Sequence, residues 1–165
     1  MAGKTFEDLF IDELRDVYDA EKRIEKALPK MAKAASSPTL SAALEEHLDQ
    51  THDHVARLEH SFDYLGKSPD RKSCEAMKGL LAESEQLAAE SDDRMVNDAA
   101  IIAAAQKVEH YEIATYGTLR EWARQLGHAQ IAALLQETLD EEAATDKRLS
   151  RLAGALNQEA AARGL

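Results

Sequence analysis

The sequence of 165 residues has few of the residues that end regular structure or cross-link it. It contains 7 glycines, 3 prolines and 1 cysteine, and aromatic residues make up only 5% of it. Because few turns are available, most of the chain must lie in long elements, and an all-β fold is set aside. Cys74 has no partner for an internal disulfide, which agrees with a reducing compartment.

Two further absences concern partners and location. The net charge is −11, and the 20 basic residues are interleaved with acids instead of forming a stripe, so nucleic acid and anionic lipid are poor partners. No stretch approaches the roughly 20 apolar residues of a membrane span, and the residues from Met1 onward reach Glu7 and Asp8 before any signal-peptide core develops. We therefore expect a cytoplasmic protein that binds neither nucleic acid nor membrane.

What the chain has is apolar residues at helical spacing. They recur every three or four positions in four segments, from Phe6 to about Ala35, from Leu44 to Leu65, from Asn97 to Gly127 and from Ile131 into the alanine-rich tail. Residues 70–95 are less periodic and predict a shorter helix. The predicted fold is all-α, a ferritin-like four-helix bundle whose long crossover between the second and third long helices carries that short helix. We expect one domain over residues 1–165.

Carboxylates interrupt the apolar stripes at four positions: Glu21, Glu109, Glu112 and Glu142. A carboxylate that faces a bundle core costs several kcal/mol unless it is neutralised, paired or bound to a cation. Four of them in one core therefore call for an explanation.

The turns place these carboxylates at one depth. The midpoint between Glu21 and Thr51 falls at residue 36, inside the turn at Ser36-Ser37-Pro38, and the midpoint between Glu112 and Glu142 is Gly127. With about 1.5 Å rise per residue, a position about 15 residues from a turn lies roughly 22 Å along its helix. That depth is near the centre of a long bundle.

His47 and His54 lie one turn to either side of Thr51 and border the same helix face. Each is either a metal ligand or a hydrogen-bond donor to one. Carboxylates with imidazoles suit iron or manganese, with zinc as an alternative, and two carboxylate layers on the third long helix suit two ions. The alternative is a buried hydrogen-bond network without metal, in which Tyr18, Tyr116 and Thr51 take part.

Several motifs, which together span nearly the whole chain, are shared with a known family. They are Asp19-Ala-Glu21-Lys22, Glu46-His47-Leu48, Arg57-Leu58-Glu59, Cys74-Glu75-Ala76-Met77, Gln106-Lys107-Val108-Glu109-His110-Tyr111-Glu112, Tyr116-Gly117-Thr118-Leu119 and Leu139 through Asp146. The chain thereby resembles the YciF-type ferritin-like stress-response proteins, which are related in fold to rubrerythrin and ferritin. The resemblance implies a compact helical bundle, often paired into a homodimer, and a stress-linked role.

Ferritin-like di-iron proteins generally place a histidine three residues after a glutamate on two helices. Here Thr145 follows Glu142 at that spacing, and Thr51 precedes His54. Two function classes therefore stay open. One is a carboxylate-rich site for two metal ions with an oxidase-like or peroxide-related role. The other is a non-enzymatic stress protein with a vestigial site, which uses its bundle for dimerisation or partner binding. The residues indicate neither a catalytic group nor a substrate.

Overall fold

The computed structural model describes residues 3–70, 72–89 and 91–163, and the regular structure in these ranges is entirely helical. The helices are α1 (Phe6–Ala34), α2 (Pro38–Leu65), α3 (Glu75–Ala89), α4 (Arg94–Gln125) and α5 (Ala129–Ala162). The predicted all-α class, with four long helices and a short helix in the crossover, is confirmed. None of the helices in the described ranges is long and apolar enough to cross a membrane.

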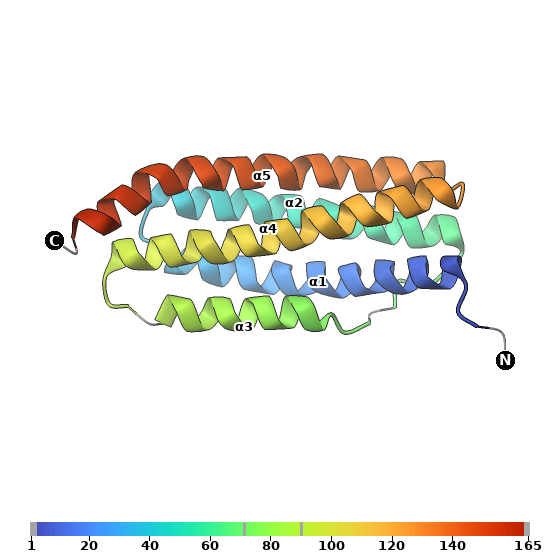
Figure 1. Ribbon diagram of the computed structural model, residues 1–165, viewed down its shortest axis with the longest axis horizontal. Helices are drawn as coiled ribbons and strands as arrows, with labels where there is room; N and C mark the ends of the chain where they lie inside the picture. Colours follow the sequence, from blue (N-terminus) through green and yellow to red (C-terminus); the bar gives the residue numbers. More distant parts are fainter. Residues whose placement is uncertain (1–2, 71, 90, 164–165) are drawn as a thin grey trace.

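The four long helices form two antiparallel hairpins packed side by side (Figure 1). The turn between α1 and α2 lies at one end of the bundle, and the turn between α4 and α5 lies at the other. α3 packs outside the bundle, along α1 and α4, and carries the chain back along its length. As a result α2 and α4 run parallel, which requires the long crossover of ferritin-like bundles.

Short-range chemistry fixes the ends of the first hairpin. Thr5 and Asp8 form a capping box, in which each side chain accepts a hydrogen bond from the other residue's backbone N–H, and α1 begins there. Ser37 caps α2, and Pro38 takes a first-turn position, where a helix needs no backbone donor. Gly66 ends α2 with a φ of 62°, a conformation that suits glycine. Pro38 therefore starts a helix as well as ending the preceding turn.

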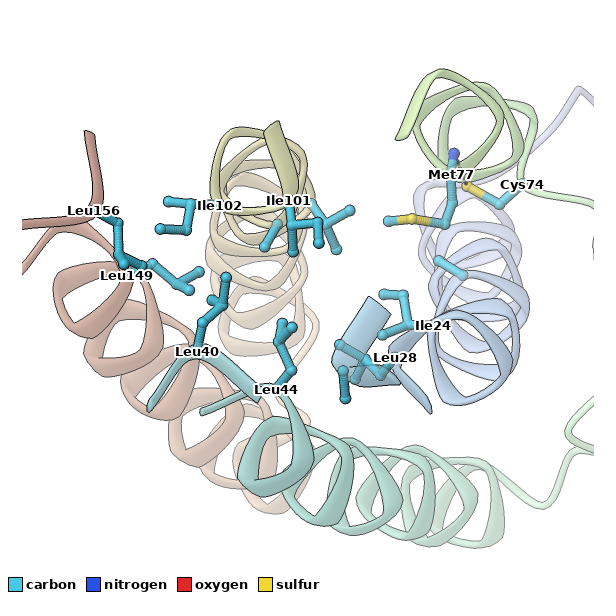
Figure 2. Packing of buried hydrophobic residues seen from close by; sticks show 14 residues of the cluster. Ile24, Leu28, Leu40, Leu44, Cys74, Met77, Ile101, Ile102, Leu149 and Leu156 are labelled. Carbon is cyan, nitrogen blue, oxygen red and sulfur yellow. Dashed lines mark hydrogen bonds between the residues drawn. The ribbon is translucent and has the colours of Figure 1, made fainter. Parts of the chain in front are cut away.

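The crossover helix α3 is held against the bundle by its first turn. The side chain of Met77 is fully buried and points into the space between α1 and α4, where Ile24 and Ile101 lie (Figure 2). At the start of the helix, the buried backbone N–H of Cys74 donates to Asp19 Oδ2 at 2.9 Å. An apolar anchor and a buried hydrogen bond thus fix α3 to α1.

The apolar core is divided into two halves. One half, towards the turn between α1 and α2, contains Ile24, Leu28, Leu40, Leu44 and Ile102. The other half, towards the turn between α4 and α5, contains Phe10, Leu14, Phe62, Leu119 and Ile131. Between these halves, at the middle of the four long helices, the buried residues are polar.

Candidate metal centre

All six residues that the sequence singled out as metal ligands lie in this polar layer, each at most 3% exposed: Glu21, His47, His54, Glu109, Glu112 and Glu142. They form two groups whose potential ligand atoms lie within 4.8 Å of one another. Glu112 and Glu142 belong to both groups. We call the set completed by Glu21 and His54 the His54 group, and the set completed by His47 and Glu109 the His47 group.

In the His54 group, residues that do not belong to the group hold the imidazole in place. Its Nδ1 faces the centre, 3.0 Å from Glu142 Oε1 and 3.4 Å from Glu21 Oε1. Its Nε2 lies 2.8 Å from Glu141 Oε2, and Arg57 binds that same carboxylate with two hydrogen bonds of 2.7 and 2.8 Å. A carboxylate on the far nitrogen fixes the orientation of an imidazole that binds metal.

A tyrosine orients the carboxylate of the same group. The phenol of Tyr116 donates to Glu21 Oε1 at 2.5 Å, and both side chains are fully buried. Burial, reinforced by the negative charge of Glu21, raises the pKa of Tyr116 well above its ordinary value. The phenol therefore keeps its proton and stays a donor to Glu21.

In the His47 group, the imidazole has no such support. His47 Nε2 lies 3.1 Å from Glu109 Oε1 and its Nδ1 lies 3.9 Å from Glu142 Oε2, but neither nitrogen has a hydrogen-bond partner within the described ranges. Thr51 turns its hydroxyl to its own helix, where it donates to the carbonyl of His47 at 2.9 Å. The ring of His47 is therefore positioned by packing and by its contacts with Glu109 and Glu142, and no group outside the site is seen to support it among the described residues.

The ionisable side chains in this layer differ in the direction in which their pKa values are shifted. Burial, together with the neighbouring carboxylates, raises the pKa of Glu109 and Glu112 well above the ordinary value, which favours their neutral forms. Burial also disfavours the charges of Glu142 and His54, but their mutual attraction outweighs it. The imidazoles lower the pKa of Glu142 to about 2, and Glu142 with Glu21 raises the pKa of His54 to about 11. A charged pair of His54 and Glu142 therefore occupies the centre of the metal-free chain.

Most polar atoms that face this centre lack a hydrogen-bond partner among the described residues: Glu21 Oε2, His54 Nδ1, both nitrogens of His47, Glu109 Oε2, and both oxygens of Glu112 and of Glu142. Unpaired buried polar atoms are rare in folded proteins because each costs about 1–3 kcal/mol. Cations at this centre would satisfy the carboxylate oxygens, His54 Nδ1 and one of the two nitrogens of His47. Carboxylates with two imidazoles are a donor set that iron, manganese and zinc accept, so the residues fit two ions.

Two residues that the sequence analysis placed in family motifs but did not assign to the site complete its surroundings. Arg57 and Glu141 form the bidentate ion pair beside His54. Arg57 follows His54 by three positions, on the same helix face, and Glu141 directly precedes Glu142. That spacing was the available signal, but charged residues at such positions are common on helix surfaces.

Known proteins resemble this chain over almost its whole length. A family model described as a domain of unknown function (DUF892) matches residues 5–162. Protein YciF of Escherichia coli is 48% identical over 154 residues, which is 93% of each protein. This likeness confirms the predicted family resemblance.

Solved structures give the same fold. The structure of the E. coli stress protein YciF has a TM-score of 0.91 at 46% identity, over 94% of this chain and 99% of that one. YcfI of Rhodopseudomonas palustris has a TM-score of 0.87 at 47% identity, over 88% of this chain and 93% of that one. A ferritin-like, diiron-carboxylate protein of Bacillus anthracis has a TM-score of 0.66 at 16% identity, over 93% and 99% of the two chains, and shows the shared fold alone. The predicted ferritin-like bundle is therefore confirmed.

Proposed function

We propose that this chain, which belongs to the family described as a domain of unknown function (DUF892), is a stress-response protein that binds two metal ions at the middle of its bundle. The chain is 48% identical to E. coli YciF, which is described as a stress protein. The observation that carries the proposal is the set of buried carboxylate and imidazole atoms that face one another without hydrogen-bond partners among the described residues.

We assign one ion to each of the two groups. Glu21 and His54 would hold one ion and His47 and Glu109 the other, and Glu112 and Glu142 belong to both groups. Iron is the first choice, with manganese or zinc as alternatives. A bound pair of redox-active ions would supply electron transfer and activation of oxygen or peroxide.

The chain's own residues prepare the site. Tyr116 orients Glu21, and Glu141 with Arg57 orients His54. Apolar clusters of the core lie on either side of the layer, and its buried charges attract one another more strongly there than in water. The homodimer and the cytoplasmic location stay predictions.

A non-enzymatic role is the second candidate. Thr145 occupies the position where related di-iron proteins place a histidine, and its hydroxyl donates to Gln50 Oε1 at 3.1 Å. The R. palustris relative is described as a candidate structural protein. Under this alternative the site is vestigial, and the bundle serves dimerisation or partner binding.

Metal analysis separates the two candidates. We expect chain purified after growth with iron to carry about two equivalents of transition metal, and Glu112→Ala to carry well under one, since both groups lose a shared ligand. Glu121→Ala, at an exposed site on the same helix, should keep the wild-type content. Less than about half an equivalent in the wild type would overturn the metal proposal.

A further inference from the structure

Two adjoining cavities lead from the surface to the His47 group. The outer cavity, of about 240 Å³, lies between α1, α3 and α4, and it is lined in part by the exposed ion pair of Lys30 and Glu85. The inner cavity, of about 10 Å³, is lined by His47 and Glu109 together with apolar side chains. Three residues line both cavities: Ala27, Met31 and Leu81. The boundary between the two is therefore entirely apolar.

The apolar residues shared by the two cavities determine which solutes can pass from the outer cavity to the inner one. An ion or a strongly hydrated solute would lose its hydration there without replacement, at a cost of several kcal/mol. A water molecule needs two to four polar partners, and the shared boundary offers none, whereas a small apolar molecule loses nothing. The inner cavity is about as large as one water-sized sphere, and the unbranched side chain of Met31 can move to widen it.

A third cavity reaches His47 from the opposite side and has a different character. It has a volume of about 190 Å³, lies between α2 and α5, and is lined by polar residues that include Glu46, Gln50, Arg148 and Arg151. Water and polar solutes suit this side. His47 thus stands between an apolar approach and a polar one.

We propose that the paired apolar cavities are the path by which dioxygen reaches the metal centre, passing Ala27, Met31 and Leu81 and arriving at Glu109 and His47. The path ends at Glu109 and His47, whose Oε2 atom and two ring nitrogens lack hydrogen-bond partners among the described residues. The need for dioxygen rests on the proposed function, but the path is a property of the metal-free chain.

Xenon tests the path without any metal. Xenon is apolar and settles in dry cavities lined by aliphatic side chains. In crystals of the metal-free protein under xenon pressure, we expect bound xenon in the outer cavity, against Met31 and Leu81. In Leu81→Ala, which removes part of the boundary, we expect xenon to reach the inner cavity. Ordered water in the outer cavity with no xenon in either variant would overturn the proposal.

Nitric oxide is a small apolar molecule that binds ferrous iron. The rate at which it associates with the ferrous protein therefore measures how fast a small apolar molecule passes through the two cavities. Ala27→Leu adds bulk at the shared boundary and should slow its association with the ferrous protein by about tenfold. Leu81→Ala should speed it. The matched control is Ala144→Leu, the same change at an exposed position on the polar cavity, which should leave the rate unchanged.

The reverse pattern, with Ala144→Leu slow and Ala27→Leu unchanged, would place the path on the polar side and overturn the proposal. Equal rates in all variants would overturn it as well. If the protein holds no iron, the proposed function fails and the xenon result alone decides the path. Thermal melts of each variant show whether it folds.

Discussion

The two groups of the candidate metal centre share two carboxylates but differ in how their other residues are held. In the His54 group, the imidazole is backed by Glu141 and Arg57 and the carboxylate by Tyr116. In the His47 group, neither ring nitrogen of His47 has a hydrogen-bond partner within the described ranges, and one oxygen of Glu109 is equally unpaired. The His54 group is therefore supported by neighbouring residues before metal arrives, whereas His47 has only its packing and its contacts with Glu109 and Glu142.

The difference explains the position of the cavities. The inner apolar cavity and the polar cavity both touch His47. A site that admits a small molecule needs space beside a ligand, and hydrogen-bond partners would fill that space. We infer that the His54 group secures the first ion, and that the His47 group keeps the second ion within reach of small molecules.

The largest expected contrast lies between the two histidines. In the metal-free protein, His54→Ala should lower the free energy of unfolding by about 3 kcal/mol, because it leaves the buried charge of Glu142 without its main partner. His47→Ala should cost clearly less, since His47 makes no side-chain hydrogen bond with the described residues. Urea unfolding of both variants measures this.

The same two variants should also differ in metal content. His54→Ala should bind less than one equivalent, and His47→Ala should keep about one, at the His54 group. Equal losses of stability and of metal in the two variants would contradict the distinction between the groups.

The sequence contained most of the fold and part of the site. Scarce glycine and proline, together with apolar residues at helical spacing, predicted the long helices, and the turn at Gly127 correctly set Glu112 and Glu142 opposite each other. These features are local or follow from symmetry about a turn. The supporting pair of Arg57 and Glu141 was missed, because it forms only when α2 and α5 pack side by side.

The cavities were also out of reach of the sequence. The short helix α3 was predicted from its weak periodicity, but the space between it and α1 depends on how closely Leu81 approaches Ala27 and Met31. Spacing along one helix does not fix the distance between two. Such a gap is a property of packing, which only the structure shows.

The next contrast tests the support of His54 by itself. Arg57→Ala removes the bidentate partner of Glu141 and should weaken binding of the first metal ion by about 10- to 100-fold. Arg148→Ala is the matched control, because it breaks another ion pair between α2 and α5, with Glu46, that does not contact His54. Titration with Fe²⁺ under anaerobic conditions gives both affinities. Equal affinities in the two variants would show that the outer pair serves only to join the helices.

The smallest expected effect concerns the hydrogen bond of Tyr116 to Glu21. Tyr116→Phe keeps the packing of the ring but frees Glu21 to rotate. It should lower the affinity for the first ion by about fivefold, which corresponds to the loss of one net hydrogen bond of about 1 kcal/mol. Tyr18→Phe removes a comparable bond, from Tyr18 to Glu59 at 2.9 Å outside the polar layer, and should leave metal affinity unchanged.

The same titration with Fe²⁺ checks both tyrosine variants, and the second ion serves as an internal reference. Because Glu21 belongs only to the His54 group, Tyr116→Phe should leave the affinity of the second ion unaltered. If Tyr116→Phe lowered the affinity for both ions equally, Tyr116 would act by holding the whole polar layer together. The two groups would then have to be treated as a single unit with one shared set of supports.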